Sequence, residues 1–587
     1  MTSTEPPPTT EQTDHSAGED SAGEDSAGED HAVEDHAVAL DMLLVDAALW
    51  PSMRMLPAGS ALRLVFELAR HPGATLRRTG QLAEELAKIA AGQSEITPAP
   101  KDRRFADEGW RDNPVLKRLL QAYLAASTAG SDLLSKADLG WRDKEQLGFA
   151  LDNLVAALSP SNNLMLNPLG WRAARDSTGR SAVTGARNLV SDLASAPRVP
   201  TMVESDAFEV GRDLAVTPGA VVLRTEVFEL IQYTPTTSNV RTRPVLIVPP
   251  VINKYYIADL RPGRSLIEYL VAGGQQVFEI SWRNPDSRHR GWNFDTYGQA
   301  ILDAFDAAQT ITGADAVIPL GFCSGGLLLS MTLAALTHRG EAQRVSAFSL
   351  GVCVLDQHHS STASAFIDER TAALAKFASS VHGYLDGRAL AEVFAWLRPD
   401  DLVWNYWVNN YLQGRKPPAF DILYWNADTT RMAAGLHHDF VDAGLTNALT
   451  RPGGTTILGV PVDLATITAD AYVLAGISDH ISPWQSCYRS AQLFGGDTTF
   501  VLSSSGHIAS IVNPPGNPKA KYQVASSPAQ DPDGWQQDTL VTQGSWWPAY
   551  LEWLRERSGP EKPAPTSAGG EGYSPTEPAP GRYVLQR

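Results

Sequence analysis

Residues 315–338 read as a short apolar strand that turns directly into a helix. The strand is DAVIPLGF (315–322), and the run SGGLLLSMTLAALTH that follows Cys323 is a good helix former ending at Gly340. After about residue 210, short runs rich in Val, Ile and Phe alternate with helical stretches, which is typical of a mostly parallel sheet flanked by helices. The further candidate strands are residues 244–250, 275–282, 345–355, 470–476 and 498–504.

The chain before this α/β region has a different spacing of apolar residues. In NPVLKRLLQAYL, Asn113 can cap a helix and Pro114 fits its first turn. We therefore expect a helical N-terminal domain at 41–210, followed by the α/β domain at 211–557. The apolar face expected for this helix consists of Val115, Leu116, Leu119, Leu120 and Tyr123.

Three segments depart from this pattern. Residues 16–40 repeat a five-residue acidic unit, which predicts a disordered tail over 1–40. Residues 358–466 interrupt the series of strands with aromatic sequence such as WNYWVNNYL, at the carboxyl edge of the sheet, so we expect a lid or cap over a site. Residues 558–587 are rich in Pro, Gly and Ser and predict a loosely ordered tail.

Charge and cysteine content exclude some classes of protein. The net charge is −18, and the first 38 residues hold eleven acidic groups without Lys or Arg, so a nucleic-acid partner is disfavoured. We find no basic and apolar leader and no run of about 18 apolar residues, so we expect a cytoplasmic protein without a membrane span. Three cysteines are too few for a disulfide framework and lack the spacing of a zinc site.

The turn at residues 321–325 has the form of a nucleophile elbow. Gly-Phe-Cys-Ser-Gly matches the Gly-x-Ser-x-Gly pattern of α/β-hydrolases, with Cys323 in place of serine. The glycines are expected because a side chain at either position would crowd the neighbouring backbone. The turn should direct the Cys323 sulfur into a cleft near the positive end of a helix, where a thiolate is favoured.

Such a nucleophile needs a base and an orienting carboxylate, in the chain order nucleophile, acid, histidine. Asp479 and His507 each follow a candidate strand in that order, so we predict a catalytic triad of Cys323, Asp479 and His507. His480 is a competing base. The oxyanion hole is assigned to the backbone N–H of Ser324 and a second donor at Val251 or Ile252.

Other residues carry weaker signals. Cys353 lies in an apolar strand and Cys487 on a helix, so both are expected to be buried and inert. The aromatic cluster with Trp404 and Tyr406 favours ordinary packing and substrate lining or subunit contact about equally. His480, Trp404 and Tyr406 are therefore carried forward as candidate substrate-lining residues.

Long motifs occur in one order from about residue 100 onward: DRRFADEGW, PPVINKYYIADL, SWRNPD, GFCSGG, RPDDLVWNYWVNNYL, DILYWNADTTR, DHISPW and SGHIASIVNPPGNPKA. In these motifs the sequence resembles the polyhydroxyalkanoate synthases, bacterial enzymes that polymerise 3-hydroxyacyl-CoA into storage polyester. AFEVG, VFELIQY and SPWQSCYRSAQLFGG are closest to the medium-chain branch. Val251 replaces the Trp or Gln of the main branches, so short- and medium-chain substrates both stay open.

The resemblance implies an α/β-hydrolase core with the triad on Cys323, Asp479 and His507. It also implies (R)-3-hydroxyacyl-CoA and a growing polyester chain as partners, no cofactor or metal, a homodimer, and a place at the surface of cytoplasmic polyester granules with their associated proteins. Cysteine suits this chemistry because an acyl group moved from CoA to Cys323 remains a thioester. Attack by a 3-hydroxyl, assisted by His507 or Asp479, then forms an oxygen ester downhill.

Two other functions remain open at this point. The same triad could pass the acyl group to water, as a thioesterase or polyester depolymerase does. A non-catalytic granule-coat protein would use the aromatic patches to bind polyester. Product analysis distinguishes the three, because only the first function yields CoA together with insoluble polyester.

Overall fold

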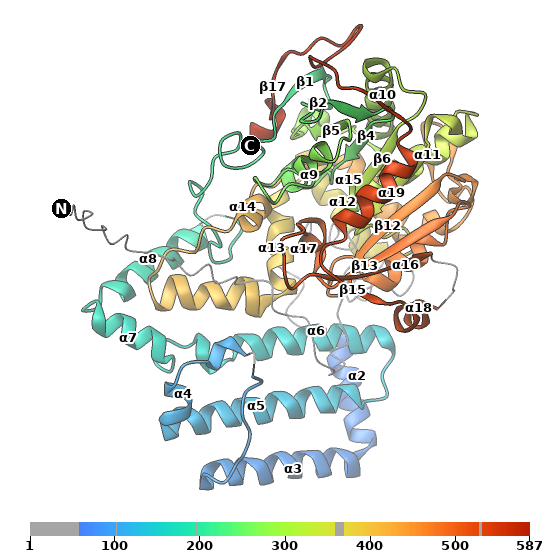
Figure 1. Ribbon diagram of the computed structural model, residues 1–587. Helices are drawn as coiled ribbons and strands as arrows, with labels where there is room; N and C mark the ends of the chain where they lie inside the picture. The colour runs from blue at the N-terminus through green and yellow to red at the C-terminus, as the bar shows by residue number, and fades with distance from the viewer. Residues whose placement is uncertain (1–57, 101, 195, 358–368, 527–530) are drawn as a thin grey trace, which may run out of the picture.

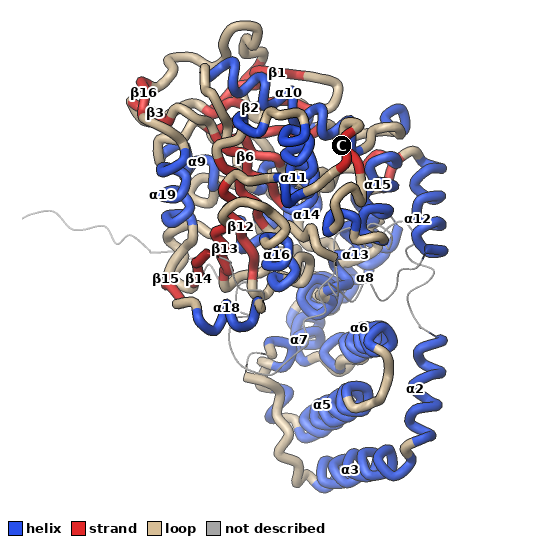
Figure 2. Tube along the Cα trace, turned by 90° about the vertical axis from the view of Figure 1, so that its right-hand side faces the viewer, coloured by secondary structure: helices blue, strands red, loops and turns tan. Residues whose placement is uncertain are grey.

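The computed structural model describes residues 58–587 except 101, 195, 358–368 and 527–530. The acidic repeat, and with it the tail expected over 1–40, lies outside the described residues. Figure 1 shows a large sheet with helices on both faces and a separate group of helices from the N-terminal part of the chain below it. Figure 2 shows the same N-terminal group at one end of the molecule.

The sheet has 11 strands in the order β15-β14-β13-β12-β7-β6-β4-β5-β2-β1-β17. Its centre, from β13 to β5, is parallel, and the strands outside it pair antiparallel. Each strand that the sequence predicted is present in this parallel centre, so the expected fold class is confirmed. These strands are β4 (Val245–Val248), β5 (Val277–Trp282), β6 (Ile318–Phe322), β7 (Ala347–Gly351), β12 (Asp470–Gly476) and β13 (Thr498–Ser503).

Both faces of the parallel centre are covered. In β4, Leu246 and Val248 belong to one hydrophobic core, whereas Val245 and Ile247 belong to the other, because successive side chains point to opposite faces. Helices α10 and α11 contribute to the first core, and α9 and α19 to the second. The helices of this region are α9 (Leu266–Ala272), α10 (Phe294–Thr312), α11 (Cys323–His338), α16 (Trp484–Ala491), α17 (His507–Ile511), α18 (Pro532–Asp538) and α19 (Trp547–Arg557).

The antiparallel edges of the sheet were not predicted. Strand β2 is buried at every position, and β15 is exposed at every position, so neither shows the alternation that identifies a half-buried strand. These two segments are strands because they pair with neighbouring strands in the folded protein. The edge strands are β1 (Gly219–Arg224), β2 (Phe228–Tyr233), β14 (Lys521–Ser526), β15 (Val541–Gln543) and β17 (Glu577–Pro578).

The N-terminal region is helical, as expected. Asn113 caps α5 through its side-chain oxygen, which accepts hydrogen bonds from the N–H groups of Val115 (2.9 Å) and Leu116 (3.3 Å). The apolar face was wrong at one position, because Val115 is 69% exposed while Leu116 and Leu120 are buried. Among the described residues, no helix has the length and apolar character needed to cross a membrane. The helices are α2 (Ala58–Arg70), α3 (Pro72–Ala91), α4 (Gly109–Asp112), α5 (Pro114–Ser135), α6 (Trp141–Ala157), α7 (Pro168–Asp176) and α8 (Arg180–Ala194).

The insertion between β7 and β12 packs on these N-terminal helices. A Cβ atom on Gly185 of α8 would lie 1.8 Å from the carbonyl oxygen of Tyr411, so only glycine permits this approach. The Tyr411 hydroxyl donates to Asp192 (2.7 Å), and the Asn188 amide donates to the Asn410 carbonyl (3.1 Å). The elements of the insertion are α12 (Glu369–His382), β8 (Tyr384–Leu385), α13 (Gly387–Leu397), the π-helical η7 (Asp400–Trp404) and η8 (Trp407–Leu412), α14 (Asp421–Ala427), β9 (Met432–Ala433), α15 (Ala434–Leu445), β10 (Thr456–Ile457) and β11 (Val460–Pro461).

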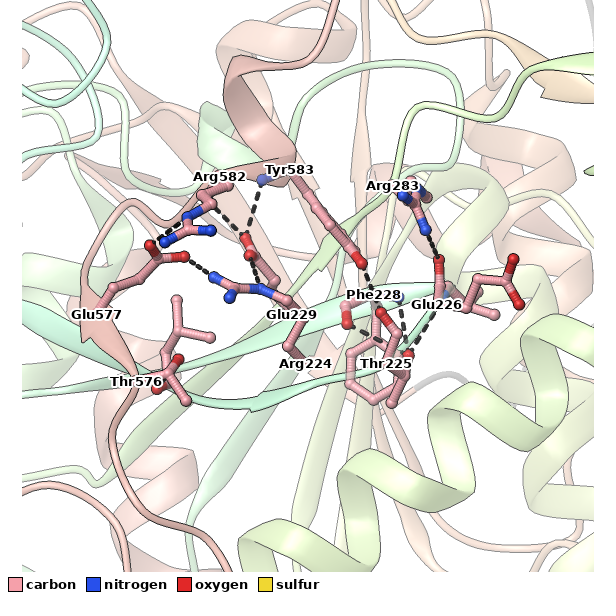
Figure 3. A network of polar contacts seen from close by, with 12 residues as sticks. Arg224, Thr225, Glu226, Phe228, Glu229, Arg283, Thr576, Glu577, Arg582 and Tyr583 are labelled. Carbon is pink, nitrogen blue, oxygen red and sulfur yellow. Dashed lines mark hydrogen bonds and ion pairs between the residues drawn. The ribbon is translucent and has the colours of Figure 1, made fainter.

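The C-terminal segment is not the loosely ordered tail that its composition predicted. Strand β16 (Glu561–Pro563) pairs with β3 (Asn239–Arg241), and β17 pairs with β1. Figure 3 shows why the last residues are held: the buried carboxylate of Glu229 accepts the backbone N–H groups of Arg582 and Tyr583, each at 2.9 Å. The Tyr583 hydroxyl also donates to the Thr225 carbonyl (2.6 Å). Pairing across long sequence distance therefore overrides the local composition.

Candidate active site

Cys323 lies at the corner where β6 ends and α11 begins. Its φ angle is 49°, in the left-handed region that a non-glycine residue rarely adopts. This strand, turn and helix is the context that a nucleophile elbow requires, and a strained nucleophile is typical of it. The expected elbow is therefore present, and Cys323 itself is buried (6% exposed).

The two flanking glycines are required by close approach of the backbone. A Cβ atom on Gly321 would lie 2.5 Å from the Cα atom of Gly326. A Cβ atom on Gly325 would lie 2.4 Å from the carbonyl oxygens of Val248 and Pro249. Any side chain here would displace the helix from the sheet, as the sequence predicted.

Asp479 and His507 meet at the same edge of the sheet. Asp479 follows β12, His507 begins α17 after β13, and the Nδ1 atom of His507 lies 2.7 Å from Oδ2 of Asp479. The other carboxylate oxygen of Asp479 accepts the N–H groups of Ile481 (2.9 Å) and Ser482 (2.8 Å). Both oxygens of this buried carboxylate are thus engaged, which holds the imidazole ring in one orientation.

The environment of His507 favours its protonated form. Burial alone would lower the pKa of His507, but the charge of Asp479, the hydrogen bond to Asp479 and the interaction with the Cys323 thiol raise the pKa to about 10. Because the Cys323 thiol contributes to this shift, the third predicted residue lies close to the His507 ring. The structure therefore brings Cys323, His507 and Asp479 together.

The predicted oxyanion donors lie side by side, but one of them is occupied. The Val251 N–H donates a hydrogen bond to the side-chain oxygen of Ser324 (3.1 Å), and both residues are buried. Val251 is therefore held beside the elbow by the residue that follows the nucleophile. The sequence suggested only the backbone of Ser324, so this hydroxyl contact was missed.

His480 is a poor alternative base in this arrangement. Its Nδ1 atom is buried and has no hydrogen-bond partner among the described residues. Burial lowers the pKa of His480 to about 4, although the neighbouring Asp479 acts in the opposite direction. A neutral ring without a hydrogen bond to the acid cannot be oriented as His507 is.

The remaining sequence candidates lie in packed surroundings. The ring of Trp404 lies 5.5 Å from that of Trp407 and 6.1 Å from that of Trp396, measured between centroids, and Tyr406 is 5% exposed. These contacts are packing, and substrate lining by Trp404, Tyr406 and His480 stays a prediction.

The other two cysteines differ from Cys323. Cys353 and Cys487 are buried, and burial raises the pKa of each thiol well above its usual range. Cys353 also packs where a Cβ atom on Gly326 would come within 2.9 Å of its sulfur. Both are buried in the core, as the sequence predicted, and their inertness stays a prediction.

One feature of the site could have been found from the sequence. Asp479 accepts N–H groups two and three residues later, which is the local turn that an aspartate favours, and Pro483 then precedes α16. The run DHISP thus contains the signal for a carboxylate fixed by its own backbone.

Comparison with known proteins agrees with this fold. The family model of the alpha/beta hydrolase fold matches residues 253–514, and that of the poly-beta-hydroxybutyrate polymerase (PhaC) N-terminus matches residues 101–270. Fold and site together define an α/β-hydrolase-fold protein with cysteine at its nucleophile elbow.

Three relatives show which family within this class the chain belongs to. Poly(3-hydroxyalkanoate) polymerases 2 and 1 of Ectopseudomonas oleovorans are 45% and 44% identical to this chain, covering 88% and 90% of it and 92% and 94% of their own length. The poly(3-hydroxyalkanoate) polymerase subunit PhaC of Cupriavidus necator is 40% identical over 84% of this chain and 85% of its own. The chain belongs to the poly(3-hydroxyalkanoate) polymerase family, which confirms the resemblance seen in the sequence.

Proposed function

We propose that the chain polymerises (R)-3-hydroxyacyl-CoA into polyhydroxyalkanoate and releases CoA, through a thioester on Cys323. The observation that carries this proposal is the cysteine at the elbow, which interacts electrostatically with a histidine whose Nδ1 atom is 2.7 Å from a buried carboxylate. The membership of the chain in the polymerase family supports the substrate class. These relatives do not favour the thioesterase hypothesis, in which water accepts the acyl group.

In the loading step, the Cys323 sulfur attacks the carbonyl carbon of the acyl-CoA thioester while His507 holds the cysteine proton. The bond between the acyl carbon and the CoA sulfur then breaks, and His507 returns the proton to the departing CoA thiolate. One thioester replaces another, so the step costs little free energy. A serine in this position would form the oxygen ester before the chain could be extended.

In the elongation step, a 3-hydroxyl oxygen attacks the acyl carbon held on Cys323, forming an oxygen ester and freeing the sulfur. We assign the hydroxyl proton to His507 rather than to Asp479. Support comes from the hydrogen bonds of Asp479, whose oxygens are already taken by His507 and by two backbone N–H groups. Asp479 then acts by orienting the ring and stabilising the imidazolium.

The negative charge that develops on the attacked carbonyl oxygen needs donors. We assign these to the backbone N–H groups of Ser324 and Val251. The Val251 N–H can serve once it exchanges its hydrogen bond to the Ser324 hydroxyl for one to the substrate oxygen.

We extend the proposal to assembly and place in the cell. A homodimer at the surface of cytoplasmic polyester granules, in contact with granule-associated proteins, is the arrangement we expect. Helix α12 supports a contact surface, because Leu374, Phe377 and Val381 are 49%, 68% and 59% exposed. Sedimentation of the active protein tests the dimer.

Product analysis tests the proposed function. Purified protein supplied with (R)-3-hydroxybutyryl-CoA or (R)-3-hydroxyoctanoyl-CoA should release CoA and form insoluble polyester, and the relative rates should decide between short- and medium-chain preference. Free hydroxy acid as the sole product would replace the polymerase with a hydrolase. Granule binding without CoA release would point to a coat protein.

A further inference from the structure

A cavity of about 280 Å³ lies outside the triad. It is formed by the start of α13, the segment between α14 and β9, and the last residue of the chain. Its lining residues include three arginines, Arg388, Arg431 and Arg587, and two aspartates, Asp386 and Asp428. We call it the basic cavity.

The basic cavity lies at the same edge of the sheet as the nucleophile. The loop after β4 carries Val251, Asn284 follows β5, and Cys323 follows β6, and these three strands are parallel neighbours. The cavity wall is bonded to two of these loops. The Arg431 N–H donates to the Asn284 side chain (2.9 Å), and the Thr430 hydroxyl donates to the Val251 carbonyl (3.0 Å). Ligands of open α/β sheets bind along this edge.

A buried lysine adds to the positive charge. Lys254 is 2% exposed and donates from Nζ to the Gln586 carbonyl (2.5 Å). Burial lowers the pKa of Lys254 to about 8, and Arg431 and Arg587 add to this effect, while Asp428 opposes it. Lys254, Arg431 and Arg587 therefore lie close together, near the loop that carries Val251.

The two carboxylates do not balance these cations. Asp428 accepts the Tyr256 hydroxyl (3.0 Å), and burial raises its pKa while the charges of Lys254 and Arg587 lower it. Asp386 lies 3.8 Å from Arg388, and both side chains are about half exposed, so water screens this pair. Among the side chains, the three guanidinium groups and Lys254 outnumber the two carboxylates.

We infer that the basic cavity binds the phosphate groups of the acyl-CoA substrate, an inference that rests on the proposed function. Guanidinium groups suit phosphate because their planar donors form paired, charge-assisted hydrogen bonds. The pantetheine arm of CoA separates its phosphates from the thioester, so a phosphate site is needed beside the nucleophile and not at it. In a chain with a net charge of −18, a local cationic site also offsets the general repulsion of an anionic substrate.

The test compares two substrates that differ only in the phosphates. (R)-3-hydroxybutyryl-CoA and the (R)-3-hydroxybutyryl thioester of pantetheine carry the same reacting group and arm. Arg431→Gln and Arg388→Gln should each raise KM for the CoA thioester about tenfold with little change in kcat, because a charge-assisted hydrogen bond is lost in substrate binding. Neither variant should alter kcat/KM for the pantetheine thioester.

The matched control is Arg175→Gln, which removes an exposed guanidinium from the N-terminal helices. It should leave both substrates unchanged. An equal loss on both thioesters in Arg431→Gln would overturn the phosphate site and make Arg431 a support of the neighbouring loop. Unchanged KM for the CoA thioester in both variants would overturn it as well.

A binding measurement separates this inference from the proposed function. Calorimetry with adenosine 3′,5′-bisphosphate should show binding to the unaltered protein that Arg431→Gln weakens about tenfold, whether or not polyester forms. Equal affinity for inorganic phosphate would indicate a site for free phosphate and overturn the assignment to CoA. If the unaltered protein converts neither the CoA thioester nor the pantetheine thioester, the proposed function fails. The bisphosphate titration still tests the cavity in that case.

Discussion

The Nδ1 atom of His507 lies 2.7 Å from Oδ2 of Asp479, and this contact joins the ends of two neighbouring parallel strands. Strand β13 delivers the histidine and β12 delivers the acid, while β6 delivers Cys323 from the other side of β7. The proposed chemistry depends on these three strand ends remaining in register.

Cys323→Ala should abolish CoA release. The loss of one sulfur atom at a turn should lower the free energy of unfolding by about 1 kcal/mol. The melting temperature should therefore change by no more than a few degrees. Cys323→Ser should lower elongation more than loading, because an oxygen ester is a poor donor for the next transfer. CoA release and polymer mass measured on the same samples separate the two steps, and wild-type polymerisation in Cys323→Ala would refute the mechanism.

A thiol reagent should modify Cys323 before Cys353 and Cys487. Burial raises the pKa of the last two thiols, so little thiolate is available there, while Cys323 interacts with the His507 ring. Peptide mass spectrometry after brief alkylation should place the label on Cys323 in step with the loss of activity. Early labelling of Cys487 would contradict the assignment.

The contact between His507 and Asp479 should appear in the pH dependence of stability. The pKa of His507 is raised to about 10 in the folded protein, above its unfolded value of about 6.5. The stabilisation is therefore complete below pH 6.5 and is lost as the pH rises toward 10. His507→Gln should remove this component, so the difference in melting temperature between the two proteins should shrink from pH 6 to pH 10.

His480 should behave in the opposite way. Its pKa is lowered to about 4, so its contribution to stability is present above its unfolded pKa and is lost as the pH falls from about 6.5 to 4. His480→Gln should reduce the loss of stability in acid and should retain far more activity than His507→Gln. Inactivation of His480→Gln to the level of His507→Gln would reopen the choice of base.

Glu229 should hold the C-terminal segment in place. Glu229→Gln weakens charge-assisted hydrogen bonds to Arg224 (2.6 Å) and to two backbone N–H groups, which should cost about 1–3 kcal/mol. Limited proteolysis should then cut the segment after Glu577 sooner. Glu226→Gln, at a neighbouring side chain that is 71% exposed, is the matched control and should change stability by less than about 0.5 kcal/mol.

The sequence predicted those features that depend on residues close together in the chain. Strand β6, the elbow and α11 are contiguous, so their pattern and the glycines at 321 and 325 could be read together. The chain order of Cys323, Asp479 and His507 followed from where strands end. The apolar face of α5 was nearly correct, because helical spacing predicts which residues share a side but not where Val115 meets solvent.

Other features depended on partners far away in the chain. The C-terminal segment looks unstructured by composition, yet it is ordered because Glu229 and strand β1, more than 300 residues earlier, accept its backbone. The basic cavity likewise combines Arg388, Arg431 and Arg587 with a loop that begins at Val251. The sequence by itself determined the parallel core and the residue types proposed for catalysis, because these follow local periodicity and turn chemistry. Only the tertiary structure decided which hydrogen bonds each group makes, because burial leaves no water to satisfy a polar group and so selects its partner.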